Sequence, residues 1–461
     1  MAATNTAAST LAALQKHLNQ QHPSIKLITP SSPDFEGMRA CFIKKDDAVP
    51  FAIARPQNAA DVQALVRYCT QHGVDFVVRA GGHDCAGRSQ VGGALTIDVR
   101  DIKHVLVSDD EKTARVGGGV VFRDLTKELD ARGLITPVGT VASVGYTGWA
   151  SLGGYGPFSN NYGLGADQIV AAKIVNAKGE LVDADAELLK GIRGGGGIFG
   201  VIVELTIKVY PLKEILVSLL IFESSNLPLT WGSYAAGYEK LIAEESVPRA
   251  LQLQSFGIEL PNLGKVLAVG ATWTSPDHDE GRRWIGKVAK FGNCLMNNPE
   301  AKSVMSYVEF NETLLTYGSY GRAYTLNIKK LTLKTAEVLG KHTALLPGGG
   351  IALSVHTLRD PVPNEASVFG SRVDHHMVEL VAMTPQRELE IKGSEWARQL
   401  LKDLREEDPD NVMDSSYVSL SGDEDSNYKK IYGSHYDGLV ELKKKVDPEN
   451  VFRHAVPRLS I

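Results

Sequence analysis

The segment from Arg79 to Ser89, Arg-Ala-Gly-Gly-His-Asp-Cys-Ala-Gly-Arg-Ser, carries the residue types of this sequence that are best suited to hold a ligand. Its histidine, His83, follows a Gly-Gly pair in a tight loop. Glycine lets the backbone turn sharply and expose N–H groups that can bind an anion such as a phosphate. A single histidine is usually structural, but this one follows a predicted buried strand and is held where a ligand would approach those N–H groups.

A second glycine run, Gly195-Gly196-Gly197-Ile198-Phe199-Gly200, formally matches the G-x-G-x-x-G turn that binds dinucleotide phosphates. That turn needs a strand before it and a helix after it. Here a helix-like segment precedes the run and an alternating strand follows it. The context therefore disfavours a Rossmann site, although these glycines still allow a backbone to approach a ligand.

Other common catalytic signatures are missing from the sequence. It has no G-x-S-x-G elbow, no H-E-x-x-H and no P-loop, which are the local signatures of α/β-hydrolases, zincins and P-loop NTPases. His375 and His376 are neighbours on a predicted strand, so they point to opposite faces and cannot converge on one metal. We interpret both as ordinary sheet residues and predict no metal site.

Strands, helices and glycine turns alternate around the His83 loop. Of 45 glycines, 24 lie in residues 81–200. This density indicates loops whose backbone makes close contact with a ligand or with another backbone segment. Residues 61–72 have helical spacing and stop at Gly73, and 200–210 alternates like a half-buried antiparallel strand. Further predicted elements are strands over 74–80 and 94–99, a segment over 113–119 that ends in a glycine loop, a helix over 120–133 and a hairpin whose first strand is 168–177.

The predicted helices become longer after Pro211, and predicted strands lie between them. This alternation predicts a second α+β domain with an antiparallel sheet over 213–409. Its predicted helices are 230–245, 279–292 and 386–404, and its predicted strands are 265–273, 351–358 and 375–383.

Composition sets the wider limits. The chain has 461 residues, 43% hydrophobic and 22% charged, with a formal net charge of −5, which excludes a disordered or fibrous protein. No basic run indicates a nucleic-acid partner. The four cysteines are too scattered for a disulfide framework. The start lacks the features of a signal peptide, and the longest apolar stretch, 216–222, is too short to cross a membrane, so we expect a cytoplasmic protein without a membrane partner.

The His83 loop strongly resembles the R-x-G-G-H motif of the berberine-bridge-enzyme-like branch of the vanillyl-alcohol-oxidase flavoproteins. The resemblance continues in family order through five further stretches. They are Val116–Gly119, GTVASVGYTG (139–148), LGGYG (152–156), the GGGGIFGVIVEL strand, and the ending YGSHYDGLVELKKKVDPENVFRH.

The resemblance implies an α+β fold with a PCMH-type FAD-binding domain of two α+β subdomains, plus a substrate domain whose antiparallel sheet is flanked by helices. Residues 1–212 and the returning segment 410–461 would form the FAD domain, and 213–409 the substrate domain. FAD would be covalently bonded to His83 through its 8α-methyl group. The cofactor-binding residues implied are Arg79, Ala80, Gly81, Gly82, His83, Asp84, Gly87, Arg88, Ser89, Gly139, Thr140, Val144, Gly145, Gly148, Gly154 and Val201.

Two positions depart from the family pattern. Many relatives carry a cysteine that forms a second bond to the flavin, and this chain has Val141 there, so we predict a single tether through His83. The usual Tyr-x-Asn of the tail is Tyr417-Val418-Ser419, and Ser419 offers only a shorter hydroxyl in place of the amide.

Oxidation of an alcohol or amine by a flavin passes a hydride to flavin N5 and requires a base for the remaining proton. Tyrosine can serve if its pKa, near 10, is depressed by cations or hydrogen bonds. Tyr155 and Tyr417 match positions of active-site tyrosines in relatives, and we predict both as catalytic. Packing alone is the alternative for each. Pocket residues cannot be selected from the sequence, but those considered are Trp273, Tyr307, Tyr317, Tyr320, Arg322 and Tyr324, with 317–324 interpreted as a loop.

The sequence thus predicts an FAD-dependent oxidase or dehydrogenase acting on a small organic metabolite, with O2 reoxidising the flavin to give H2O2. The resemblance makes natural-product biosynthesis the expected setting. Three alternatives stay open: a flavin-containing cyclase or cycloaddition catalyst without net oxidation, a non-catalytic flavin-bearing metabolite-binding protein, and, weakest, a nicotinamide dehydrogenase. The sequence does not indicate the oligomeric state.

Overall fold

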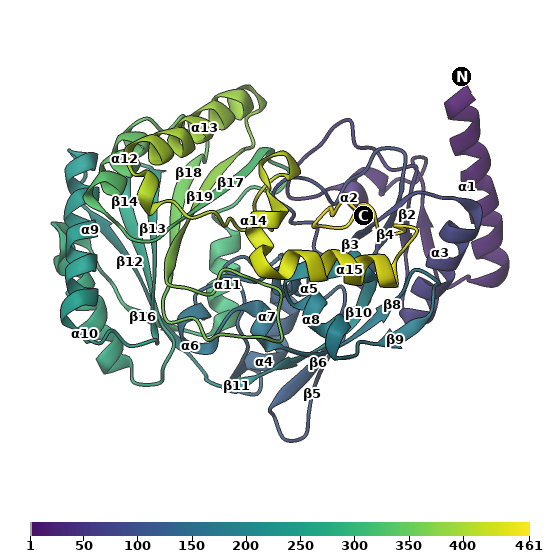
Figure 1. Cartoon of the computed structure of the whole chain (residues 1–461), viewed down its shortest axis with the longest axis horizontal. Helices are drawn as coiled ribbons and strands as arrows, with labels where there is room; N and C mark the ends of the chain where they lie inside the picture. Colours follow the sequence, from purple (N-terminus) through teal and green to yellow (C-terminus); the bar gives the residue numbers. More distant parts are fainter. Residues whose placement is uncertain (1) are drawn as a thin grey trace.

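The computed structural model describes residues 2–461 and shows two lobes side by side (Figure 1). One lobe contains two small sheets and both chain termini. The other contains a large sheet with helices on its outer side. None of the helices in the described range has the length and apolar character needed to cross a membrane.

The first lobe contains a four-stranded sheet in the order β1-β2-β4-β3 and a five-stranded sheet in the order β5-β6-β10-β8-β9. β3 and β4 are parallel, as are β2 and β4, whereas the five-stranded sheet is antiparallel. The strands in these orders are Lys26–Ile28, Ala52–Arg55, Leu95–Asp98 and Phe76–Arg79, then Val105–Val107, Thr113–Gly117, Val201–Lys208, Ile169–Val175 and Leu181–Asp183.

Local signals set the bounds of α3 (Ala59–His72), which packs on the first sheet. The Asn58 side chain accepts the Asp61 N–H at the start of the helix. At its end Gly73 takes the left-handed conformation with φ 63° and donates its N–H to Cys69. The predicted helix over 61–72 is confirmed. The predicted helix over 120–133 is shorter, α4 (Phe122–Asp130), because the chain turns through Gly133.

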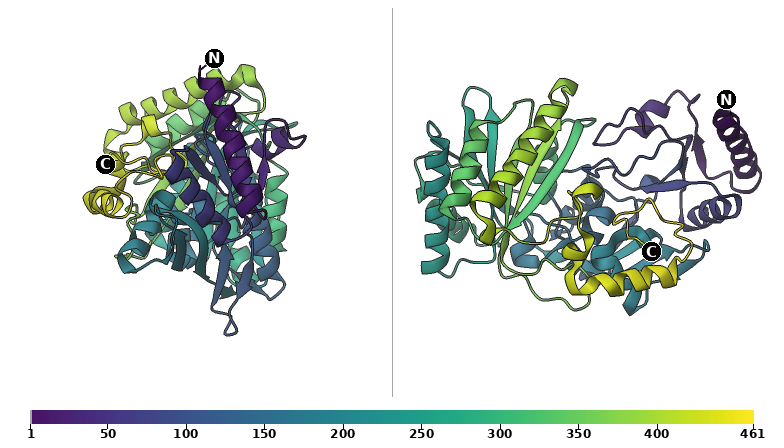
Figure 2. Two further views of the ribbon diagram at one scale, coloured as in Figure 1. Left: turned by 90° about the vertical axis from the view of Figure 1, so that its right-hand side faces the viewer. Right: turned by 45° about the horizontal axis from the view of Figure 1, so that its top comes forward.

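The second lobe is built on an eight-stranded antiparallel sheet, ordered β15-β12-β14-β13-β18-β19-β17 with β16 paired to β12. Helices α9, α10, α12 and α13 lie on its outer face (Figures 1 and 2). In that order the strands are Cys294–Met296, Ile215–Phe222, Gly264–Trp273, Leu251–Leu260, Ala352–Leu358, His375–Thr384, Tyr320–Ile328 and Glu300–Lys302, and the helices are Leu227–Glu244, His278–Val288, Leu333–Ala344 and Glu390–Glu407.

All predicted elements of the second domain are confirmed within a few residues, and its antiparallel sheet is as expected. One interpretation is wrong. Residues 317–324 are not a single loop, because β17 begins at Tyr320 and pairs with β19 along its whole length. Hydrogen bonds to a neighbouring strand override the loop signal of two glycines. Other elements of this lobe were not predicted, among them β12, β13, β17, α12 and α11 (Val304–Glu312).

The C-terminal segment returns to the first lobe through α14 (Tyr428–Tyr432) and α15 (Tyr436–Val446). α15 packs against α8 (Ala186–Gly195), and Figure 1 shows it, in yellow, lying along the lower right lobe. The glycine run after α8 passes into β10, so the helix-then-strand context that disfavoured a Rossmann turn is confirmed.

Candidate active site

The His83 loop and the loop over 139–145 lie against each other through their backbones. A Cβ atom added at Gly81 would lie 2.2 Å from the Gly145 nitrogen, and one at Gly145 would lie 2.6 Å from the Gly81 nitrogen. Only glycine permits this approach. The dense glycines of this region therefore press partly against other backbone, which the sequence could not distinguish from a ligand. We call residues 81–86 and 139–145 the loop wall.

The loop wall has free donors. Gly81 and Gly82 are buried, yet their N–H groups have no hydrogen-bond acceptor in the described chain. Gly82 takes a φ of 73°, which turns successive N–H groups toward one side. Since buried N–H groups nearly always have partners, this arrangement fits the FAD pyrophosphate that the resemblance implies.

The imidazole of His83 lies in an aromatic setting. Its ring stacks on Phe42 at 4.7 Å between centroids and meets the edge of Tyr317 at 5.6 Å. Burial lowers the pKa of His83 to about 4, and the Glu312 carboxylate opposes this only in part. The ring is therefore neutral at pH 7, and one nitrogen keeps a lone pair. Tyr317 is the one considered pocket residue in ring contact with His83.

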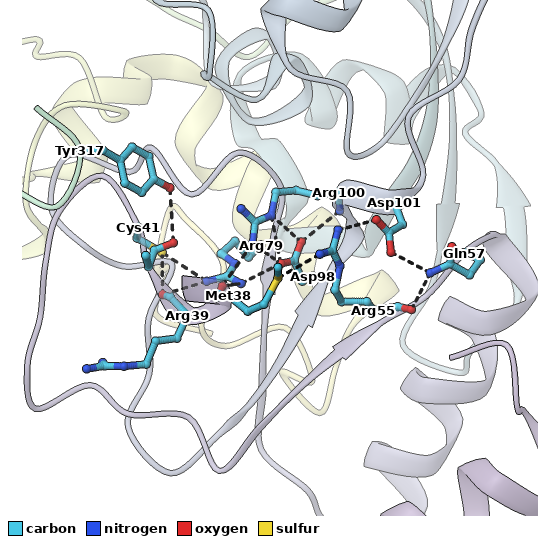
Figure 3. A network of polar contacts seen from close by, with 11 residues as sticks. Met38, Arg39, Cys41, Arg55, Gln57, Arg79, Asp98, Arg100, Asp101 and Tyr317 are labelled. Carbon is cyan, nitrogen blue, oxygen red and sulfur yellow. Dashed lines mark hydrogen bonds and ion pairs between the residues drawn. The ribbon is translucent and has the colours of Figure 1, made fainter. Parts of the chain in front are cut away.

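Arg79 anchors the strand before the loop (Figure 3). Its guanidinium donates to Asp98 at 2.7 Å and to the Met38 and Arg39 carbonyl oxygens at 2.5 and 3.1 Å. Asp98 also accepts from Arg100, and these hydrogen bonds hold the pKa of Asp98 below its usual value against burial. The two terminal nitrogens of Arg79 are thus bonded within the protein, whereas its Nε is buried without a partner. The contribution of Arg79 to a cofactor site is to fix the loop.

Arg88 closes the other end of the loop. It donates to Asp84 at 2.7 Å, to Asp423 at 3.2 Å and to the Val418 carbonyl oxygen at 3.1 Å. The loop is therefore tied to the C-terminal segment, which lies more than 300 residues away in sequence.

Most of the other residues implied for cofactor binding lie in or beside the loop wall. Gly87, Ser89 and Ala80 flank it, and Thr140 and Val144 within it are partly accessible. The space around Gly148 is open, since nothing lies within 4 Å of a Cβ added there. Gly139 lies close to Phe122. Val201 differs, because its side chain packs in the core under the four-stranded sheet.

Both predicted catalytic tyrosines come together in one buried cluster. The rings of Tyr155 and Tyr417 meet edge to face at 4.8 Å. The Tyr417 hydroxyl accepts the Gly154 N–H at 3.0 Å, and the Tyr155 hydroxyl lies 2.7 Å from His375 Nε2. His375 Nδ1 donates to the Val373 carbonyl oxygen, so its Nε2 accepts the Tyr155 proton.

The role of His375 was not predicted from the sequence. The prediction that His375 and His376 point to opposite faces of the sheet is confirmed, since His376 contacts Tyr238 on the other face. However, His375 is a direct partner of a predicted catalytic tyrosine. No local signal marks this role, because the pair is 220 residues apart.

Burial raises the pKa of both tyrosines. That of Tyr417 rises to about 12, although the Gly154 N–H works against the rise, and that of Tyr155 rises as well. No cation of the described chain lowers either pKa enough for a tyrosine to be ionised, and so to act as a base, at pH 7. The protein alone thus presents both as protonated phenols.

The inner face of the large sheet is polar where it meets the first lobe. Glu379 on β19 lies 2.8 Å from His356 Nε2 on β18, and His356 lies 3.1 Å from both Ser354 Oγ and Gln254 Nε2. Glu379 and His356 each keep 16% of their side chains exposed. We call these four residues the sheet wall.

The position of Glu379 relates the sheet wall to the rest of the site. Two residues before it on β19, Met377 packs with Tyr155 and Tyr417, and two residues after it, Val381 packs with Phe42 and Cys85. Burial raises the pKa of the Cys85 thiol, and the Glu379 carboxylate raises it further. Glu379 therefore lies between the tyrosine cluster and the residues beside His83, and sequence reasoning missed it.

Most residues considered for the pocket lie elsewhere. Trp273 and Tyr324 are buried in the core beneath the outer helices, because strand register turns them to that face. Arg322 pairs with Glu424 and Asp425. Tyr307 packs beside the core of the first lobe, and Tyr320 lies near two cations at the surface.

Comparisons with known proteins identify two segments of the chain. Residues 50–185 match the family described as FAD binding domain, and residues 420–457 match the family described as berberine and berberine like. The FAD-linked oxidoreductase aurO of Gibberella zeae is 33% identical over 446 residues, which cover 95% of this chain and 86% of that protein. (R)-6-hydroxynicotine oxidase of Paenarthrobacter nicotinovorans is 34% identical over 193 residues, 41% of this chain and 42% of that protein.

Solved structures share the fold. The 6-hydroxy-D-nicotine oxidase from Arthrobacter nicotinovorans superposes with a TM-score of 0.82 at 22% identity, covering 93% of this chain and 96% of that chain. BBE-like 1 from Physcomitrella patens superposes with a TM-score of 0.81 at 19% identity, covering 97% and 100%.

Proposed function

The chain belongs to the berberine-bridge-enzyme-like FAD-linked oxidoreductases, and we propose that it oxidises a small organic metabolite with O2 as the final electron acceptor. The expected PCMH-type fold and FAD dependence are confirmed by the same relatives. The observation that carries the proposal is a neutral imidazole at His83 beside buried N–H groups that have no acceptor in the chain.

FAD would be held by the loop wall. The N–H groups of Gly81 and Gly82 would bind the pyrophosphate, and His83 would form the tether. Val141 has no nucleophile, so one tether is proposed. When bound, FAD supplies the acceptor for a hydride from substrate carbon. The protein positions the substrate and accepts the remaining proton.

Tyr417 is the proposed base rather than Tyr155. A hydrogen bond donated to a phenol oxygen favours the phenolate, and Tyr417 accepts one from Gly154. The Tyr155 hydroxyl instead donates a hydrogen bond to His375, so we assign Tyr155 a role in holding the tyrosine cluster together. Removal of such a base typically lowers the rate of catalysis by about 10²–10⁴-fold.

The sheet wall would bind the substrate. Its carboxylate and imidazole suit a metabolite with hydroxyl or amine groups, which donate hydrogen bonds to them. The family resemblance adds that this metabolite is a secondary metabolite.

The first test is the absorbance spectrum of the purified protein, followed by acid precipitation. We expect flavin absorbance that stays with the pellet, and in His83→Ala flavin that passes to the supernatant. A colourless protein would contradict the FAD assignment. Flavin released by acid from the unmodified protein would contradict the tether alone.

Turnover separates the remaining alternatives. A panel of aromatic alcohols and amines is screened for anaerobic bleaching of the flavin, and each active compound is then tested for H2O2 released per product in air. One H2O2 per product supports an oxidase, whereas product without H2O2 supports a cyclase. A binding protein would show no turnover to lose in Tyr417→Phe.

A further inference from the structure

A carboxylate from the second lobe reaches the His83 ring through one serine hydroxyl. His83 Nε2 lies 2.7 Å from Ser143 Oγ, and Ser143 Oγ lies 2.8 Å from both carboxylate oxygens of Glu312. The Ser143 backbone N–H also donates to this carboxylate at 2.9 Å. Imidazole, hydroxyl and carboxylate thus form a continuous chain.

The protons in this chain can be assigned. An ionised carboxylate only accepts hydrogen bonds, so the Ser143 hydroxyl donates its hydrogen bond to Glu312. The Ser143 oxygen then accepts from His83, which places the imidazole proton on Nε2. Nδ1 keeps the lone pair, and it has no hydrogen-bond partner in the described chain. The nitrogen that can attack an electrophile is therefore the one left free.

Glu312 is held in place by contacts between the two lobes. It is the last residue of α11 (Val304–Glu312), which packs against α4. Arg123 on α4 donates to Glu309 at 2.5 Å, and Asp130 accepts the Met305 N–H at 2.9 Å. The helix cannot shift toward or away from Ser143 without breaking these contacts.

We propose that Glu312, acting through Ser143, positions His83 for the covalent attachment of FAD and draws off the imidazole proton as the bond forms. This inference rests on the proposed tether. In the attachment, Nδ1 bonds to the 8α carbon and one C–H bond of the methyl group breaks. The methyl proton and the Nε2 proton leave, and the two electrons pass through the flavin to O2, giving H2O2. Glu312 is a positioning residue, since it acts on His83 only through the serine.

Electrostatics explains why the carboxylate is needed. Attack by Nδ1 while Nε2 keeps its proton creates a positively charged ring. Burial disfavours that charge, as the lowered pKa of His83 shows, and Glu312 opposes the effect. Loss of the Glu312 charge leaves the cost of burying the imidazolium unopposed.

The test measures attachment itself. Full-length protein from riboflavin-limited cells is mixed with FAD, and the flavin that stays with the acid pellet is followed over time. We expect Glu312→Gln and Ser143→Ala to slow attachment about tenfold or more. Glu312→Gln should leave the non-covalent binding of FAD before acid treatment unchanged. Ser143→Thr retains the hydroxyl and should restore the rate.

Glu309→Gln is the matched control, because position 309 lies one turn earlier on α11 and does not contact Ser143. The substitution keeps an acceptor for Arg123 and leaves the Asp130–Met305 hydrogen bond in place, so α11 stays docked. It should attach FAD at the unmodified rate. A normal rate in Glu312→Gln, or equal slowing in Glu309→Gln, would overturn the role of Glu312 while the tether stands. Release of all flavin from the unmodified protein would overturn the tether, and the inference with it.

Discussion

The loop wall and the sheet wall line the same site with different atoms. The loop wall offers backbone N–H groups and one neutral imidazole, packed so closely that Gly81 and Gly145 cannot carry side chains. The sheet wall offers only side chains, Glu379 with His356, Ser354 and Gln254, on a backbone whose own hydrogen bonds are used within the sheet.

This difference separates two tasks. Backbone donors bind a constant phosphate group and depend on glycine positions rather than on side-chain chemistry. Side chains on a strand can change without moving the sheet, since each one alternates with a neighbour that packs on the opposite face. We infer that the loop wall keeps the cofactor while the sheet wall decides the substrate.

The largest expected effect concerns the histidine of the loop wall. His83 has a folded pKa of about 4 against an ordinary value of 6.5, so between these values the unfolded chain binds more protons. The free energy of unfolding of the FAD-free protein should therefore fall by up to about 3 kcal/mol as pH drops from 6.5 to 4. Thermal unfolding of His83→Gln should lack this part of the loss, and identical pH curves would contradict it.

A second experiment tests whether the catalytic base is Tyr417 or the Glu379–His356 pair of the sheet wall. With a pKa near 12 for Tyr417, the phenolate fraction rises about tenfold per pH unit below that value. Flavin reduction by substrate should then accelerate about a hundredfold from pH 7 to 9, in stopped-flow measurements. A flat profile would move the base from Tyr417 to the Glu379 pair.

The sheet wall is tested directly by Glu379→Gln, which keeps the shape but removes the charge. We expect kcat/KM to fall about 30-fold, the effect of losing one hydrogen bond to a charged group of about 2 kcal/mol. The acid-stable flavin should be unchanged, because the loop wall is untouched. Lost flavin in this variant would show that the two walls are not independent.

The smallest effect should come from Tyr155→Phe. It removes the hydrogen bond to His375, and we expect about 1 kcal/mol lower stability by denaturant unfolding. Turnover should fall far less than in Tyr417→Phe. A comparable loss in both variants would make Tyr155 catalytic as well.

The sequence alone determined the elements whose signals are local. Helix α3 follows from its Asn58 cap and Gly73 end, and β10 from its alternation, because these depend on residues a few positions apart. The glycine loop at His83 and its resemblance to known flavoproteins were equally readable, since close backbone packing tolerates no other residue type.

Only the tertiary structure decided which side chains meet. Ser143 is 169 residues from Glu312, and Tyr155 is 220 residues from His375, so no short pattern encodes either contact. Strand register turned Trp273 and Tyr324 toward the helices and Glu379 toward the cofactor loops. Register and docking arise from the packing of whole faces, and therefore a site built across two lobes becomes visible only when those faces are brought together.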